Sequence, residues 1–167
     1  MSIERPDADA VEEIADLWVD LAAEQRTVGS HLRAEENRGT ITENLRRPVA
    51  ADGLYVAVAD DGDDYVADAG TILGFVMFNA GNDLLATSTT RGTIENLYVR
   101  PDYRDSGIGS ELIATAERKL AARGVEAVKL EVLADNEAAR RFYRRHGYEP
   151  HRVQLEKQVE SDNHSKD

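Results

Sequence analysis

The chain has no cysteine among its 167 residues. That absence excludes disulfide bonds, thiolate metal sites and a cysteine nucleophile. Histidine is also scarce, and its four copies do not follow the spacing of metal ligands: they are His31, His146, His151 and His164. We therefore expect no metal centre.

Long apolar runs are missing as well. None approaches the roughly 20 residues that a membrane-spanning helix requires. The first ten residues, MSIERPDADA, lack the basic-then-apolar pattern of a secretion signal. Both absences favour a cytoplasmic protein with no membrane partner. The length fits one domain, which we expect over residues 1–157, followed by a polar, frayed tail over residues 158–167.

Positive charge is in short supply. Lys and Arg together number 20 against 32 Asp and Glu, which gives a net charge of −12. Such a surface repels nucleic acid, so we expect no nucleic-acid partner. Because the acids are spread along the whole chain, adaptation to high salt, as in a halophilic source, explains them better than substrate steering. Attraction of amines or basic peptides stays open as the alternative.

Hydrophobic periodicity predicts strands and helices in a single α/β or α+β domain. Pro48 is expected to end the second helix, and Asn136 to cap the last. The near-continuous apolar run over residues 125–133 predicts a strand buried on both faces. Strands are expected over residues 2–5, 54–59, 71–80, 92–100, 125–133 and 151–157, and helices over residues 7–24, 30–47, 108–123 and 137–145.

The stretch RDSGIG places Arg104 just before Gly107 and Gly109, where a predicted strand gives way to a predicted helix. The first N–H groups of a helix are unpaired and carry partial positive charge. Glycine lets a ligand approach the backbone closely, and arginine adds a cation with forked donors. Each part suits a pyrophosphate, although a simple tight turn would use the same glycines.

Two other nucleotide-binding patterns do not fit this stretch. The dinucleotide fingerprint requires a third glycine where the chain has Leu112. The P-loop requires Lys and then Ser or Thr after its last glycine, where the chain has Ser110 and Glu111. A nucleotide-binding regulator is therefore disfavoured.

Two longer segments carry a resemblance. LYVRPDYRDSGIGSELI and LEVLADNEAARRFYRRHGYEP resemble the GNAT superfamily of acetyl-CoA-dependent N-acetyltransferases. Arg104, Gly107 and Gly109 match its R/Q-x-x-G-x-G/A loop. Asn136 and Tyr143 match its N-x-x-A-x-x-x-Y pattern. The resemblance implies a GNAT fold, with a mixed, mostly antiparallel sheet of about six to seven strands and about four helices.

The resemblance also implies roles. The backbone of Leu97 and Val99 would pair with the pantetheine arm of acetyl-CoA, and the N–H groups of residues 104–110 would hold its pyrophosphate. Tyr143 would protonate the departing thiolate. The residues so placed at acetyl-CoA are Leu97, Tyr98, Val99, Arg104, Asp105, Ser106, Gly107, Ile108, Gly109, Ser110, Asn136 and Tyr143.

A base is also needed, because a lysine-like amine with a pKa of about 10.4 is mostly protonated at neutral pH. Glu95 and Glu131 are the two candidates, and both lie on predicted strands. A carboxylate inside the buried strand pattern KLEVL is costly unless it is paired or used. A structural role stays open for each: an ion pair for Glu131, and a solvent-facing strand position for Glu95. Tyr143 could likewise be a core aromatic residue.

These residues predict an N-acetyltransferase that acts on a primary amine without a covalent enzyme intermediate. The spacing from Glu131 to Tyr143 resembles the branch that acetylates protein N-termini, including a ribosomal protein's terminal alanine. A protein N-terminus, a lysine side chain and a small amine all stay open as acceptors, and a homodimer stays open as the assembly. The alternative is a non-catalytic acyl-CoA sensor on the same fold.

Overall fold

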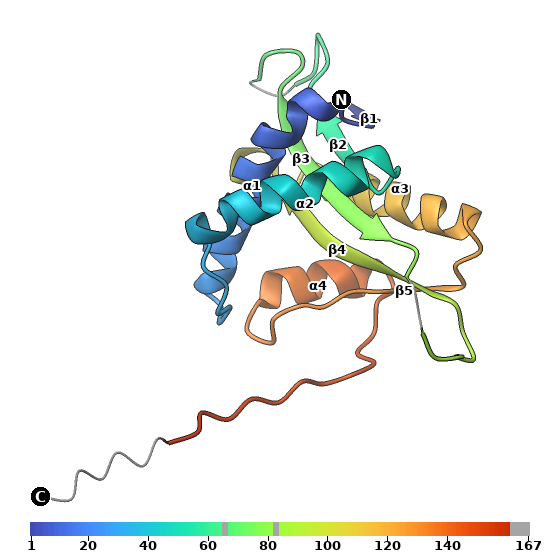
Figure 1. Cartoon of the computed structure of the whole chain (residues 1–167). Coiled ribbons are helices and arrows are strands. Elements are labelled where there is room, and N and C mark those ends of the chain that lie inside the picture. The colour runs from blue at the N-terminus through green and yellow to red at the C-terminus, as the bar shows by residue number, and fades with distance from the viewer. Residues whose placement is uncertain (65–66, 82–83, 161–167) are drawn as a thin grey trace, which may run out of the picture.

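A computed structural model describes residues 1–64, 67–81 and 84–160. Within that part of the chain, five strands form one sheet in the order β1-β2-β3-β4-β5 (Figure 1). Neighbours from β1 to β4 are antiparallel, whereas β5 runs parallel to β4. The strands are β1 (Ser2–Glu4), β2 (Leu54–Val58), β3 (Ile72–Asn79), β4 (Arg91–Val99) and β5 (Ala127–Lys129).

Helices cover both faces of this sheet. The α-helices are α1 (Val11–Arg26), α2 (Arg38–Ala50), α3 (Ile108–Ala122) and α4 (Glu137–Arg145). Three short 3-10 helices precede α1, α2 and α3: they are η1 (Ala8–Ala10), η2 (Glu35–Asn37) and η3 (Pro101–Tyr103). The mixed α/β fold expected from the sequence is therefore confirmed, with fewer strands than the six to seven expected.

Alternation along the strands builds two cores, because successive strand side chains point to opposite faces. On β2, Val56 packs in the cluster that holds Leu17 and Trp18 of α1, whereas its neighbour Ala57 packs in the cluster of α3. The helices α1 and α2 thus cover one face, and α3 covers the other.

The second helix departs from the prediction at both ends. It begins at Arg38 instead of residue 30, because Gly29 has a φ of 106° and the Arg26 side chain bonds the carbonyl groups of His31 and Leu32 outside any helix. Pro48 lies inside α2, which ends at Ala50. A proline lacks the backbone N–H and so removes one hydrogen bond of the helix. Pro48 lies in the last turn of α2, and the helix ends two residues after it.

Two strand predictions in the C-terminal third are wrong. The expected strand over residues 125–133 shortens to β5, whose three residues are half-buried or exposed instead of buried on both faces. Residues 151–157 form no strand, and every residue from 149 to 160 is exposed. The chain there runs away from the sheet (Figure 1). A strand requires a hydrogen-bonding neighbour, and no described residue supplies one.

Among the described residues, no helix is long and apolar enough to cross a bilayer.

Candidate functional site

The strand β4 has an open edge along its second half. It pairs with β5 only through Arg91, Gly92 and Thr93. Farther along, the Arg100 N–H donates to the Leu73 carbonyl at 2.9 Å, toward β3.

Since backbone groups alternate in direction along a strand, those of Leu97 and Val99 face away from β3. They therefore line the gap that opens where β5 leaves β4. The sequence placed these same two residues along the pantetheine arm, and the geometry suits that role.

Glu95 is the extra residue of a β-bulge in β4. Met77 is opposite Asn96 while its neighbour Phe78 is opposite Ile94, so Glu95 has no partner on β3. A bulge locally bends a strand and re-aims the side chain it carries. Asn79 Nδ2 donates to the Glu95 carboxylate, which is exposed. The bulge begins two residues beyond Thr93, the last position that pairs with β5.

The RDSGIG loop forms the N-terminus of α3. Gly107 caps the helix with a φ of 88°, in the left-handed region that favours glycine. The first bond of the helix runs from the Glu111 N–H to the Gly107 carbonyl, so the described residues provide no acceptor for the N–H groups of Ile108, Gly109 and Ser110.

Gly109 lies close to α4. A Cβ there would lie 3.3 Å from the Cε2 and Cζ atoms of Phe142 on α4. The loop therefore combines an exposed turn, free N–H donors and a helix dipole, which together suit an anion.

Arg104 does not aim its side chain into this loop. Its Nε donates to the Val99 carbonyl at 2.8 Å, and its Nη2 contacts both carboxylate oxygens of Glu24 at 2.9 Å. Its guanidinium also lies 5.4 Å from the centre of the Tyr98 ring. The backbone N–H of Arg104 donates to the Pro101 carbonyl at 3.3 Å. Arg104, the cation expected at the phosphate, thus links the end of β4 to α1 as a strut, a side chain that bonds both elements.

Tyr98 is likewise turned away from the open edge. Its side chain is buried in the α1 face of the core, and its hydroxyl donates to Glu24 at 3.3 Å. Burial, with the nearby Glu24 charge, raises its pKa to about 12. Its backbone groups point toward β3, because it lies between Leu97 and Val99. The structure therefore gives Tyr98 no group at the open edge, whereas the Arg104 side chain occupies the Val99 carbonyl there.

Other loop residues hold the turn itself. The Ser106 hydroxyl donates to the Tyr103 carbonyl at 2.5 Å. Asp105 has a φ of 60° and is exposed. Ser110 also contacts His146, the residue that follows α4. His146 Nδ1 lies 2.8 Å from the Phe142 carbonyl, and its Nε2 lies 2.9 Å from the Ser110 hydroxyl.

Because a carbonyl only accepts, Nδ1 carries the proton, and in the neutral ring Nε2 accepts from Ser110. His146 thus joins the end of α4 to the start of α3. No sequence signal marks this contact.

Tyr143 lies on α4 in an aromatic cluster. Its ring packs edge-on against Phe142 at 5.3 Å and against Tyr148 at 5.8 Å between centres. Burial raises the pKa of Tyr143 to about 12, so it stays protonated at neutral pH. Its hydroxyl makes no hydrogen bond to any described residue. The hydroxyl is therefore free to donate a hydrogen bond.

Asn136 caps α4 as expected: its Oδ1 accepts from the Ala139 N–H at 3.2 Å. Glu131 is not on a strand. It follows the end of β5, is exposed, and has no ion pair or hydrogen bond among the described residues. That finding removes the paired structural acid as an explanation for Glu131. No group of acidic or histidine side chains in the described ranges could hold a metal ion.

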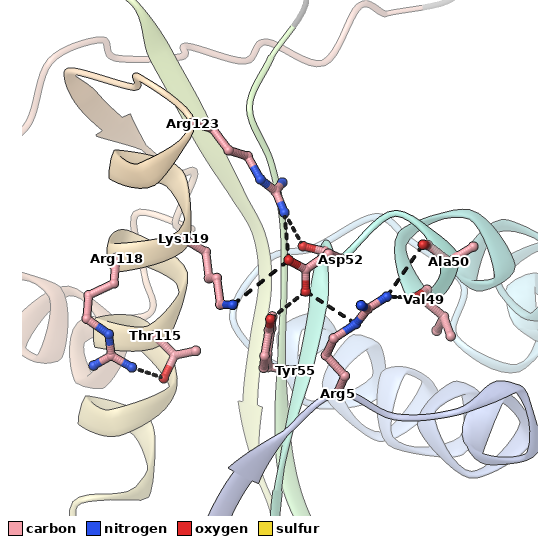
Figure 2. A network of polar contacts seen from close by, with 9 residues as sticks. All are labelled: Arg5, Val49, Ala50, Asp52, Tyr55, Thr115, Arg118, Lys119 and Arg123. Atoms are coloured by element: carbon pink, nitrogen blue, oxygen red, sulfur yellow. Dashed lines mark hydrogen bonds and ion pairs between the residues drawn. The ribbon is translucent and has the colours of Figure 1, made fainter.

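A second polar cluster holds α3 from its other end (Figure 2). Asp52 lies between α2 and β2 with a φ of 57°. Its carboxylate accepts from the Tyr55 hydroxyl and faces three cations, Arg5 at 3.3 Å, Arg123 at 3.4 Å and Lys119 at 4.0 Å. The Tyr55 bond and these charges hold the pKa of Asp52 below its usual value. The cluster ties α3 to β1 and β2.

Comparison with known proteins finds relatives in sequence and solved structures of similar fold. The chain is 40% identical over 81 residues to an acetyltransferase of Sodalis glossinidius, a match that covers 48% of this chain and 52% of that protein. The chain thus spans about half the length of the curated relatives it matches.

Among solved structures, the BH1408 protein of Bacillus halodurans superposes with a TM-score of 0.79 at 21% identity, covering 95% of this chain and all of the other. A predicted acetyltransferase of Clostridium acetobutylicum, solved with acetyl-CoA, gives a TM-score of 0.67 at 15% identity, covering 94% and 95% of the two chains. These likenesses show the fold.

The model of the acetyltransferase (GNAT) family matches residues 34–148. That range holds the open edge of β4, the glycine loop at α3 and the aromatic cluster on α4. The chain belongs to the GNAT acetyltransferase family.

Proposed function

We propose that this protein is an acetyl-CoA-dependent N-acetyltransferase that transfers an acetyl group to a primary amine. The observation that carries the proposal is the continuity between the open edge of β4, at Leu97 and Val99, and the unpaired N–H groups of Ile108, Gly109 and Ser110. A strand edge suits the amide groups of a pantetheine arm, and a helix N-terminus suits a pyrophosphate.

The residues that would hold acetyl-CoA are fewer than the sequence predicts. The backbone of Leu97, the N–H of Val99 and the N–H groups at the start of α3 carry the binding, because the Val99 carbonyl already accepts from Arg104. Arg104 contributes as a strut that fixes the loop. When bound, acetyl-CoA supplies an acyl group that is already activated for transfer, so the protein's own residues have to move protons and orient the amine.

Tyr143 is the proposed proton donor. Its pKa of about 12 keeps the proton on the hydroxyl through the neutral range, where a departing thiolate needs one. General acid help of this kind is typically worth about 10² to 10⁴-fold. The packing of Phe142 and Tyr148 around it holds the ring in one orientation.

The proposed base is Glu95, with Glu131 as the second candidate. The last paired positions of the two parallel strands are Thr93 and Lys129. Glu95 follows Thr93 by two residues, and Glu131 follows Lys129 by two residues. The two glutamates therefore lie on the two segments that separate beyond this last pair. Glu95 is favoured because the bulge re-aims it and Asn79 holds its carboxylate, whereas Glu131 has neither support.

Turnover with a panel of acceptors tests the proposal. Thiol release would be followed with an N-terminal peptide, a lysine peptide and a polyamine, at molar salt. We expect turnover with at least one acceptor, a loss of about 10²-fold in kcat for Glu95→Gln, and a smaller loss for Glu131→Gln. A reversed order would make Glu131 the base. Binding of acetyl-CoA with no turnover on any acceptor would instead indicate a sensor.

A further inference from the structure

The helix α4 concentrates positive charge in a chain whose net charge is −12. Four of its nine residues are exposed arginines, called the α4 arginines here: Arg140, Arg141, Arg144 and Arg145. The helix dipole favours cations in the last turn, which explains Arg144 and Arg145 but not the two arginines before them. The middle of the helix therefore carries charge that its own backbone does not call for.

The α4 arginines also lack a counter-ion in the described part of the chain. Arginines elsewhere reach across to carboxylates: Arg38 lies 2.8 Å from Asp16, and Arg104 lies 2.9 Å from Glu24. No ion pair joins an α4 arginine to a described carboxylate, not even to Glu137 one turn before Arg141. A chain with 32 acidic residues could have supplied such partners. Their absence indicates that the anion comes from a ligand.

One side of α4 lies next to the glycine loop. The Phe142 ring is so close to Gly109 that a Cβ there would lie 3.3 Å from it. The guanidinium carbon of Arg145 lies 6.0 Å from the centre of the same ring. Arg141 precedes Arg145 by four residues and so shares its side of the helix. Arg141 and Arg145 thus place positive charge beside the start of α3.

The other two α4 arginines belong to a different side of the helix. Arg140 Nη1 donates to the Ala134 carbonyl at 3.0 Å, in the segment before α4. Arg144 follows Arg140 by four residues and shares that side. Because it has the same exposure and the same lack of an ion pair, Arg144 serves as an internal control for Arg145.

Acetyl-CoA carries a second anionic group that fits this position. Beyond the pyrophosphate, its ribose has a phosphate monoester at the 3′ position, and such a group carries a charge of about −1.5 to −2 at neutral pH. The Arg104 guanidinium is bonded to Glu24, so the glycine loop contributes backbone donors rather than a free cation. The forked donors of a guanidinium match the oxygens of a phosphate.

We propose that Arg141 and Arg145 bind the 3′-phosphate of acetyl-CoA while the start of α3 holds its pyrophosphate. This inference rests on the proposed function and names the group by which the site recognises its acyl donor. The arginine pair makes the site selective for coenzyme A over pantetheine donors that lack the 3′-phosphate.

Calorimetric titration with coenzyme A and with dephospho-coenzyme A tests the proposal, because the two ligands differ only in this phosphate. Molar salt shortens the Debye length to about 3 Å, so the difference in Kd then reports direct contact rather than long-range attraction. We expect the wild type to bind coenzyme A about threefold to tenfold more tightly than dephospho-coenzyme A. The double variant Arg141→Gln with Arg145→Gln should bind the two ligands equally.

The matched control is Arg47→Gln with Arg144→Gln. It removes two exposed arginines, each in the last turn of its helix and each without an ion pair among the described residues. The control should keep the wild-type ratio of the two Kd values, and circular dichroism checks that every variant is folded. An unchanged ratio in the Arg141 and Arg145 variant, or a ratio lost equally in the control, would overturn the proposal.

The wild type alone separates this inference from the function beneath it. Equal binding of both ligands would overturn the role of the arginine pair and leave the acetyl-CoA assignment standing. Binding of neither ligand by a folded wild type would remove both. An RNA oligonucleotide that displaces coenzyme A from the wild type would assign the α4 arginines to nucleic acid instead, contrary to the proposal.

Discussion

Asp52 supports a quantitative prediction, because a single carboxylate faces three cations and one hydroxyl (Figure 2). The variant Asp52→Asn keeps the side-chain shape and the acceptor for Tyr55, and asparagine tolerates the φ of 57° at this position. It removes only the charge. Any loss of stability then reports the attraction to Arg5, Lys119 and Arg123.

The magnitude follows from the exposure of the group. Hydrogen bonds and ion pairs to charged groups contribute about 1.5 to 3 kcal/mol when sheltered. The Asp52 side chain is 33% exposed, and the three cations are 31% to 50% exposed, so solvent screens part of that energy. We expect a loss of about 1 to 2 kcal/mol, which lowers the Tm by roughly 2 to 8 °C for a chain of this size.

The sign of the pH dependence is fixed by the direction of the shift. The pKa of Asp52 is lower in the folded state, so its contribution is fully present above the unfolded value of about 3.9. It is lost as the pH falls through the folded value. The Tm difference between wild type and Asp52→Asn should therefore be constant from pH 5 to 7 and shrink below about pH 4.

Scanning calorimetry of both proteins measures this difference. The control is Asp105→Asn, which removes a charge from another residue of positive φ, 60°, that has no ion pair among the described residues. Its Tm should change by less than the equivalent of about 0.5 kcal/mol. Equal effects of the two substitutions, or a difference that grows toward low pH, would refute the reasoning.

Three further predictions concern the loop and the proton donor. Gly107→Ala should destabilise the fold by about 1 to 2 kcal/mol because φ is 88° there, whereas Gly39→Ala, in an open helical position, should stabilise it by about 0.4 to 1 kcal/mol in the same urea titration. Glu24→Gln should raise the Kd for acetyl-CoA about twofold to fivefold, because Arg104 loses a half-exposed ion-pair partner. Calorimetric titration measures this Kd, and an unchanged value would show that the contact between Arg104 and Glu24 does not order the loop. Tyr143→Phe should lower kcat about 10²-fold or more, and the wild-type kcat profile should show no loss below about pH 10 from this group; an undiminished variant would exclude Tyr143 as the donor.

Local signals in the sequence predict the site better than they predict the edge of the sheet. The bounds of α4 are the predicted ones because Asn136 supplies its own cap. The turn before α3 is also local, since it depends on the backbone freedom of Gly107. Strand formation depends on a neighbouring strand, and no described strand pairs with residues 151–157, where the sequence predicts one.

Side-chain partners far apart in the sequence were not predictable. Glu24 precedes Arg104 by 80 positions, and no pattern links them. From the sequence, Arg104 beside the glycines indicates a phosphate ligand. In the structure its guanidinium instead contacts Glu24 on α1. The bulge at Glu95 depends on the register with β3, and the sequence of β4 carries no sign of it.

The most direct test of the account is thermal unfolding of wild type and Gly107→Glu at molar salt, each with acetyl-CoA, ATP or NAD. A ligand that binds only the folded state adds about 2.7 kcal/mol of stability at a hundredfold excess over Kd. We predict a rise in Tm for the wild type with acetyl-CoA alone, and no rise for a folded Gly107→Glu. A folded wild type that gains no stability from acetyl-CoA would contradict the assignment of the β4 edge and the α3 N-terminus as its binding site.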